Sequence, residues 1–479
     1  MLFNSIDFAF FLPIVFGIYW LFHRSRKLQN LIILISSYIF YGWWDWRFLS
    51  LIALSTILDY FIGLQLGKSQ QSDSNKKLLL FLSLFFNLGA LAFFKYFNFF
   101  IENFSNAFSF FGSNLDAVRL DIILPVGISF YTFQTLSYSI DVYRGKISPT
   151  KNLLSFASFV SFFPQLVAGP IERASHLLPQ FEADRKFDYA IASDGMRQIL
   201  WGFFKKIVIA DRCAIIVNGV FDNYETMNGS TLLIGALAFS FQIYGDFSGY
   251  SDIAIGTSKL FGFDLMTNFK TPYFSRNIAE FWNRWHISLS TWFRDYLYIP
   301  LGGSRFSQFV TLRNVIIVFV VSGLWHGANW TFVVWGALNG LLFIPLLLFN
   351  KHKTYNRANS NFLEGSKFKK SASIISTFMV VTLLWIIFRS ASIVQAFEYI
   401  SGILSPTILS KPIWIKEFLI IAFWIGFLLL IEWSNRDKEH QFSIGNQSAP
   451  VRRTLYLIVI LGIFFFGKFE SNSFIYFQF

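Results

Sequence analysis

Charged residues and cysteines are both scarce in this chain of 479 residues. Asp, Glu, Lys and Arg make up only 14% of it, whereas soluble domains carry roughly 25%. The single cysteine, Cys213, excludes a disulfide within the chain and a metal cluster built on cysteines. The chain also has no P-loop, no HExxH zinc motif and no GxSxG nucleophile motif. The enzyme classes that depend on those motifs are therefore excluded.

Hydrophobic residues take the place of the missing charge, at 54% of the chain with 63 Phe, 19 Tyr and 15 Trp. Apolar runs of the ~20 residues that span a bilayer recur along the sequence. They predict an all-α polytopic membrane protein with roughly 10 to 12 transmembrane helices, multi-pass in the inner or plasma membrane. The clearest runs lie near residues 4–22, 29–49, 51–67, 78–101, 121–141, 231–258, 314–350 (two spans), 374–389, 417–433 and 454–469.

Basic residues follow the first and third apolar runs, for example Arg24, Lys27, Lys68 and Lys76. Such residues mark cytoplasmic loops, so we expect the N-terminus to lie outside. The net charge of +12 follows from basic loops of this kind, or serves to attract an anionic cofactor such as a nucleotide. Most aromatic residues lie within the apolar runs, so we expect no nucleic-acid partner.

Two polar stretches, residues 67–77 and 350–373, interrupt the chain and are typical of solvent loops. We interpret residues 1–479 as a single integral-membrane domain, with a catalytic core at about 121–349 and C-terminal spans and a tail at 374–479. No stretch is long enough for a soluble domain. A large soluble partner would therefore be a separate chain.

A histidine, His326, stands in an apolar run that has no Asp, Glu, Lys or Arg between Asn314 and Asn350. Glycines surround it in "SGLWHGANW", with Trp325 and Asn329 close by. Glycines allow close helix packing or a break in the helix that lines a cavity. A buried imidazole either bonds a neighbouring helix or serves as a general base near pH 7.

The stretch "EFWNRWHISLSTWFRDYLYIPLGGSR", residues 280–305, mixes charged and aromatic residues. If it is one helix, four polar residues share a face at three- and four-residue spacing: Asn283, His286, Ser290 and Arg294. Glu280 and Arg284 are spaced to pair. Trp residues often anchor a helix at the membrane interface, but that does not explain a histidine and two arginines. The pattern favours a helix lining a vestibule.

Two carboxylates, Asp246 and Asp252, interrupt the run at 231–258. They indicate a proton path, an ion site or pairing with basic residues such as Arg284 or Arg294. We favour pairing, because an uncompensated buried charge costs several kcal/mol.

Several of these stretches together resemble the membrane-bound O-acyltransferase family, in its bacterial branch that O-acetylates alginate and other exopolysaccharides. The resemblance rests on "FWNRWHISLSTWFRDYLYIPLGGSR" and "SGLWHGANWTFVVWGALNG". The stretches "ILPVGISFYTFQTLSYSIDVYRG", "AGPIERASHLLPQF" and "YGDFSGYSDIAIG" agree, and the likeness covers nearly the whole chain in order.

The resemblance implies a ring of helices around a central funnel and tunnel. His326 matches the family's active-site histidine and His286 its second polar position. The expected donor is acetyl-CoA, with no bound cofactor and no metal. The final acceptor is a polysaccharide, reached through a periplasmic or cell-surface partner of SGNH-hydrolase type. The residues expected to bind the donor or substrate are Arg284, Arg294, Asn283, Ser290, Asp246, Trp325 and Asn329.

The ending "FIYFQF" carries one hydroxyl, that of Tyr476. In related bacterial systems a similar ending is held to carry the acyl group, so the resemblance makes Tyr476 a candidate acyl carrier. The alternative is an aromatic segment that folds onto the membrane surface.

Three other functions fit parts of the sequence. D-alanyl transfer to teichoic acid is the nearest within the family. A secondary transporter also places His and Asp in broken helices. A structural scaffold does not need His326 so deep in apolar sequence.

Overall fold

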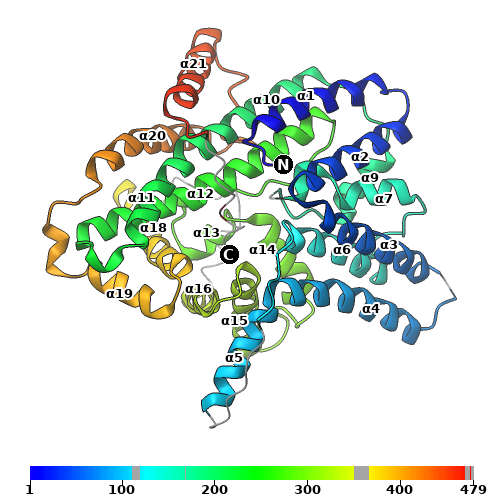
Figure 1. Cartoon of the computed structure of the whole chain (residues 1–479), viewed down its shortest axis with the longest axis horizontal. Helices are drawn as coiled ribbons and strands as arrows, with labels where there is room; N and C mark the ends of the chain where they lie inside the picture. Colours follow the sequence, from blue (N-terminus) through cyan, green and yellow to red (C-terminus); the bar gives the residue numbers. More distant parts are fainter. Residues whose placement is uncertain (69, 111–118, 168, 350–365, 470–474, 476–479) are drawn as a thin grey trace. The chain divides into compact units, whose positions relative to one another are not determined.

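The computed structural model describes every residue except 69, 111–118, 168, 350–365, 470–474 and 476–479. All regular elements of the described chain are helical (Figure 1), which confirms the all-α prediction. The described chain divides into two compact units. The first is Met1–Ala192 with Thr257–Met266, and the second is Ser193–Gly256 with Thr267–Phe479.

The polytopic membrane class is confirmed by helices of sufficient length and apolarity. Within the described residues, six stretches meet both criteria. The run at 314–350 forms two of them, as predicted. The total of ten to twelve crossings remains a prediction. The six stretches are Arg26–Leu66, Asp73–Ser109, Gln308–His326, Trp330–Leu348, Lys367–Arg389 and Ala449–Phe466.

The first unit is built around long N-terminal helices. Serine side chains cap several of their first turns; Ser5, Ser25 and Ser72 each accept a hydrogen bond from a backbone N–H. Its helices are α1 (Ile6–Leu21), α2 (Arg26–Asp45), α3 (Leu49–Leu66), α4 (Asp73–Leu91), α5 (Phe97–Phe110), α6 (Ile128–Tyr143), α7 (Leu153–Val160), α8 (Phe163–Leu166) and α9 (Ala174–Glu182).

The second unit contains both candidate histidines. Helices α10 (Tyr189–Phe203) and α12 (Gly229–Leu260) run through the sequence boundaries between the units. The others are α11 (Asp211–Phe221), α13 (Ile278–Trp282), α14 (Ile287–Phe293), α15 (Gln308–His326), α16 (Trp330–Leu348), α18 (Lys367–Arg389), α19 (Ile393–Ile403), α20 (Ile415–Ser434) and α21 (Ala449–Phe466). Two π-helical turns, η3 (Phe204–Ala210) and η6 (Arg294–Tyr298), extend α10 and α14.

Helices α15 and α16 pack at very short range. A Cβ atom at Gly323 would collide with the carbonyl oxygen of Phe332, and one at Gly336 with that of Phe319. Only glycine permits this approach. Close helix packing, one of the two roles that the sequence left open for glycines near His326, is thus seen at Gly323 and Gly336. The packing fixes the end of α15, where His326 lies.

The thiol of Cys213 lies in α11 and is fully buried. Because no cysteine is available beside it, the residue packs as a small apolar side chain.

Candidate active site

The segment that carries His286 is a break between two short helices. Helix α13 ends at Trp282 and α14 begins at Ile287, while His286 adopts a left-handed backbone with φ of 45°. The preceding segment supports this break, because Lys270 N donates to Arg284 O at 2.9 Å and Ile287 N to Asn268 O at 3.0 Å. A left-handed non-glycine residue is strained and is often found at functional sites.

The expectation of one continuous helix across 280–305 is therefore wrong. Helical spacing placed His286 on one face with Ser290 and Arg294, but the left-handed turn redirects its side chain. The turn separates a fully buried histidine from polar neighbours that line a cavity. Spacing alone carries no signal for a positive φ.

The imidazole of His286 is oriented by Asn268. Nδ1 of His286 lies 3.2 Å from Oδ1 of Asn268. That oxygen also accepts from the hydroxyl of Ser288 at 2.9 Å, while Nδ2 of Asn268 donates to Ser251 at 3.1 Å. Because Oδ1 only accepts, Nδ1 of His286 must carry the proton.

The other ring nitrogen, Nε2, is consequently an unprotonated acceptor. It is buried and has no hydrogen-bond partner among the described residues. Burial lowers the pKa of His286 to about 3, so the ring is neutral near pH 7. An unsatisfied buried acceptor costs roughly 1–3 kcal/mol, so its retention points to a use in binding or catalysis.

The second histidine, His326, is the last residue of α15 and is 2% exposed. Its ring centroid lies 6.4 Å from that of His286. Trp325 lies beside both rings, at 5.1 Å from His326 and 6.0 Å from His286, and Trp335 packs on His326 at 5.3 Å. The fold thus brings together two histidines that are forty residues apart in sequence, inside an aromatic wall.

A cavity of about 730 Å³ lies next to this pair, which is a typical volume for a small-molecule site. Its polar lining includes Asn283, Ser290 and Arg294, three of the residues expected to bind the donor. Neither histidine lines it. Trp282 does line it, and its ring packs on Trp335 at 5.6 Å. A wall two tryptophans thick therefore separates this side of the cavity from His326.

Comparison with known proteins identifies the architecture. The model of the membrane-bound O-acyltransferase family matches residues 32–353, which is more than half of the chain. The chain belongs to the membrane-bound O-acyltransferase family. It is therefore an acyltransferase, as the resemblance implied.

Three relatives show which kinds of protein the chain is similar to. A probable alginate O-acetylase of Pseudomonas aeruginosa is 42% identical over 85% of this chain and 75% of its own length. The peptidoglycan O-acetyltransferase of Helicobacter pylori is 33% identical over 100% of this chain and 98% of its own. The teichoic acid D-alanyltransferase of Bacillus subtilis is 29% identical over 56% of this chain and 69% of its own.

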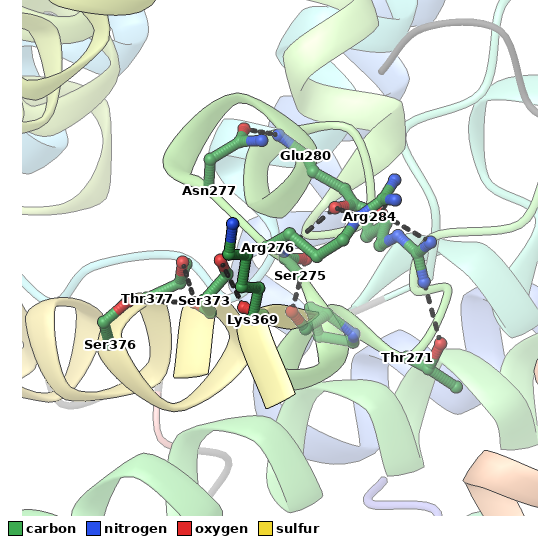
Figure 2. Close-up of polar contacts among 11 residues, drawn as sticks. Thr271, Ser275, Arg276, Asn277, Glu280, Arg284, Lys369, Ser373, Ser376 and Thr377 are labelled. Atoms are coloured by element: carbon green, nitrogen blue, oxygen red, sulfur yellow. Dashed lines mark hydrogen bonds and ion pairs between the residues drawn. The ribbon is translucent and has the colours of Figure 1, made fainter. Parts of the chain in front are cut away.

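The predicted ion pair of Glu280 and Arg284 is confirmed in this acyltransferase. Glu280 also forms an ion pair with a second arginine, Arg276. Figure 2 shows the carboxylate of Glu280 shared between Arg276, at 2.9 Å, and Arg284, at 2.8 Å. Arg284 also donates to the hydroxyl of Thr271 at 3.3 Å. Two guanidinium groups share one carboxylate, so the group carries one net positive charge and retains attraction for an anion.

Arg294 lies in a more open setting than Arg284. Its side chain is 59% exposed, and its Nε contacts the carboxylate of Asp295 at 2.8 Å. An exposed ion pair of this kind contributes little to stability. Arg294 is therefore well placed to exchange Asp295 for an anionic ligand at the cavity.

Asp246 and Asp252 do form ion pairs, but not with the arginines named above. Nζ of Lys206 lies 2.9 Å from Asp246, and Nζ of Lys205 lies 2.5 Å from Asp252. The expected partners Arg284 and Arg294 are instead engaged with Glu280 and Asp295. Two adjacent lysines face two carboxylates because they lie in the π-helical turn η3.

Two other residues expected to bind the donor have structural contacts. The side chain of Asn329 caps α16 by accepting from Thr331 N at 3.0 Å, and it donates to Ala391 O at 2.9 Å. Asp246 and Asn329 do not line the cavity. Their roles toward the donor remain predictions. The candidate carrier Tyr476 lies outside the described residues.

Asn268 is the residue that sequence reasoning missed. It lies in "LMTNFKTPYF" and fits no chemical motif. Its importance comes from a loop that runs alongside the break at His286, and that pairing has no local sequence signal.

Proposed function

We propose that this acyltransferase moves an acetyl group from cytoplasmic acetyl-CoA across the membrane for O-acetylation of an extracellular or periplasmic polysaccharide. The observation that carries the proposal is the buried pair His286 and His326 next to a cavity of about 730 Å³. The bacterial relatives are named for O-acetylation of alginate and of peptidoglycan, which supports the acetyl group and the polysaccharide class.

The cavity suits the two chemical parts of a coenzyme A thioester. Polar and cationic side chains, among them Arg294, Ser290 and Asn283, suit the phosphates and amides. Apolar side chains from α15 and α16, among them Phe319 and Phe343, suit the thin pantetheine arm. Coenzyme A is a substrate here, and the proposal needs no bound cofactor.

The two histidines divide the chemistry. His326 takes the proton of an attacking hydroxyl, which forms a C–O bond to the acetyl carbon as the C–S bond breaks. The proton then passes to the leaving thiolate, so coenzyme A departs as a thiol. Because neither histidine lines the cavity, the thioester end of the arm has to pass the packed rings of Trp282 and Trp335. Nε2 of His286 then accepts a hydrogen bond from an amide N–H of the pantetheine arm and holds the thioester near His326. Protonated His286 as an oxyanion stabiliser is disfavoured, because burial lowers the pKa of His286 to about 3 and so keeps the ring neutral near pH 7.

The attacking hydroxyl is that of Tyr476, as the family resemblance implies. The tyrosyl ester then passes its acetyl group to a separate partner of SGNH-hydrolase type at the outer face. The protein is placed in the inner or plasma membrane with its N-terminus outside, in line with its basic loops.

The test is O-acetylation of purified cell-surface polysaccharide by NMR, in cells with wild type or His326→Ala at matched membrane levels. Loss of the O-acetyl signal in the variant supports the proposal, and unchanged acetylation refutes it. An assay with thioesters separates the rivals. Turnover of D-alanyl thioester in place of acetyl-CoA favours teichoic acid D-alanylation, and no thioester turnover favours a transporter.

A further inference from the structure

A fully buried carboxylate, that of Asp59, lies among three packed helices of the first unit. Helices α3, α4 and α6 all contact one another (Figure 1). Two of them, α3 and α4, belong to stretches long and apolar enough to span a membrane. Asp59, on α3, is 0% exposed. Among the described residues, no Lys, Arg or His forms an ion pair with it.

The hydrogen bonds to this carboxylate come from the other two helices. Ser83 on α4 donates to Oδ1 at 2.5 Å, and Ser139 on α6 donates to the same oxygen at 2.8 Å. Nδ2 of Asn87, on α4, donates to Oδ2 at 2.8 Å. All three donors are uncharged. They orient the carboxylate but leave its negative charge inside an apolar bundle, where an uncompensated charge is costly.

Further oxygen atoms meet at Asn87. Its Oδ1 accepts from the hydroxyl of Ser55 on α3 at 3.0 Å and from that of Thr135 on α6 at 3.1 Å. Each helix thus contributes two polar residues four positions apart, a spacing that puts both on one face: Ser55 and Asp59, Ser83 and Asn87, Thr135 and Ser139. Six oxygen-bearing side chains converge, whereas a protonated carboxyl group would need only one or two hydrogen-bond partners.

A small cavity of about 90 Å³ borders this cluster. Ser55 and Asn87 line it, together with Tyr131 and Thr132 of α6 and apolar side chains of α3 and α4. A cavity of ~10–15 Å³ is already enough for one water molecule. The cluster therefore has room for ordered water beside its oxygen atoms.

We propose that Asp59 and the hydroxyl and amide oxygens around it bind one Na⁺ ion, which joins α3, α4 and α6. One carboxylate balances one monovalent cation, whereas a divalent ion would leave an excess positive charge in the same apolar place. Hydroxyl groups accept as well as donate, so Ser83 and Ser139 can turn a lone pair toward the ion. Asn87 can present its Oδ1 after its side-chain amide turns over.

The size of the cluster favours Na⁺ over the larger K⁺. Its polar atoms lie only 2.5 to 3.1 Å from their partners. A small ion can be admitted by slight outward movement of these side chains, and the adjoining cavity can supply a water ligand. The site is separate from acyl transfer and does not rest on the proposed function.

The experiment measures binding of radioactive Na⁺ to full-length protein in nanodiscs. It also measures the melting temperature at constant ionic strength in NaCl, KCl or choline chloride. We expect wild type to bind about one Na⁺ per chain. Its melting temperature should rise with Na⁺ concentration, because a ligand that binds only the folded state stabilises that state. An equal rise should need a roughly tenfold higher concentration of K⁺, and choline should give none.

Two variants test the ligands. Asp59→Asn removes the charge and keeps the shape of the side chain, so it should abolish Na⁺ binding. In choline chloride its melting temperature should equal or exceed that of wild type, because no buried charge is left uncompensated. Ser139→Ala removes one oxygen ligand and should raise the Kd for Na⁺ roughly tenfold.

The matched control is Asp141→Asn. It removes another buried carboxylate of α6, one that is already paired with Lys146 at 3.5 Å. Because that carboxylate has its own cation, the variant should bind Na⁺ with the Kd of wild type.

Loss of Na⁺ binding in folded Asp59→Asn, with binding retained in Asp141→Asn, supports the site. The proposal is refuted if wild type binds no Na⁺ or if Asp59→Asn binds it as wild type does. If Asp59→Asn does not fold, an unchanged Kd in Ser139→Ala refutes the site instead.

Infrared spectroscopy tests whether a proton takes the place of the ion. If wild type in NaCl shows the carbonyl stretch of a protonated carboxyl group, and Asp59→Asn lacks it, Asp59 holds a proton and the proposal fails. None of these measurements uses acetyl-CoA. A negative result therefore leaves the proposed function intact, and an absence of acetyl-CoA turnover leaves the Na⁺ site intact.

Discussion

Replacing Asn268 tests how the orientation of His286 supports catalysis. The three shortest hydrogen bonds of the buried Asn268 amide join it to His286, the Ser288 hydroxyl and Ser251, at 3.2, 2.9 and 3.1 Å. At about 1 kcal/mol each, Asn268→Ala should lower the free energy of unfolding by roughly 3 kcal/mol. Without the acceptor at Nδ1, the imidazole is free to place its proton on Nε2. The amide N–H of the pantetheine arm then faces the N–H at Nε2 of His286 and not a lone pair that could accept a hydrogen bond from it.

The expected kinetic cost follows from that mismatch. An amide of bound acetyl-CoA that has no hydrogen-bond partner weakens binding by roughly 1–3 kcal/mol. We therefore expect kcat/KM for acetyl-CoA to fall about tenfold to hundredfold. Asn268→Asp keeps the acceptor oxygen but adds a negative charge, which raises the pKa of His286 from its low value. Activity of that variant should therefore be lost as pH falls, within a range where wild type is still active.

The assay is the pH–rate profile of acetyl-CoA turnover in nanodiscs, with thermal unfolding as the control for folding. The reasoning is refuted if folded Asn268→Ala has wild-type kcat/KM, or if the aspartate variant has the same acid limb as wild type. Either result would mean that the proton position on His286 does not affect the donor.

Three other predictions concern separate features. Trp282→Ala should raise the preference for butyryl-CoA over acetyl-CoA roughly tenfold, because the indole closes one side of the cavity; an unchanged ratio places the acyl group elsewhere. Gly336→Ala should lower the free energy of unfolding by about 1–3 kcal/mol through a clash with α15, as judged by thermal unfolding. Hydrogen bonds to Asp264 and Glu172 raise the pKa of His176 from 6.5 to about 10. Its stabilisation should be full below pH 6.5 and lost as pH rises toward 10, so melting temperatures of wild type and His176→Gln should converge there.

The sequence was informative where one physical property dominates. Long apolar runs predicted the helices and the membrane class, and the glycines near His326 indicated either close helix packing or a break in the helix. The motif resemblance singled out both histidines before any geometry was known. These features depend on composition or on a local pattern, which a single chain displays directly.

The errors lie where backbone conformation or distant pairing decides the structure. His286 does not lie on the helix face that spacing predicted, because its backbone φ is in the left-handed region. The spacing of side chains in a sequence does not encode that angle. Asp246 forms an ion pair with Lys206, which lies in the π-helical turn η3. Asn268 acts through hydrogen bonds to His286 and Ser288, which lie 18 and 20 residues later in the sequence. Each of these features emerges only when the chain is folded.

The buried thiol of Cys213 has a practical consequence for mapping this protein in cells. Water-soluble maleimides do not reach a fully buried side chain in α11, and the chain has no other cysteine. The native sequence is therefore a ready background for single-cysteine labelling. One reporter cysteine before α1, read with membrane-impermeant reagent on intact cells, would establish which side of the bilayer the N-terminus occupies.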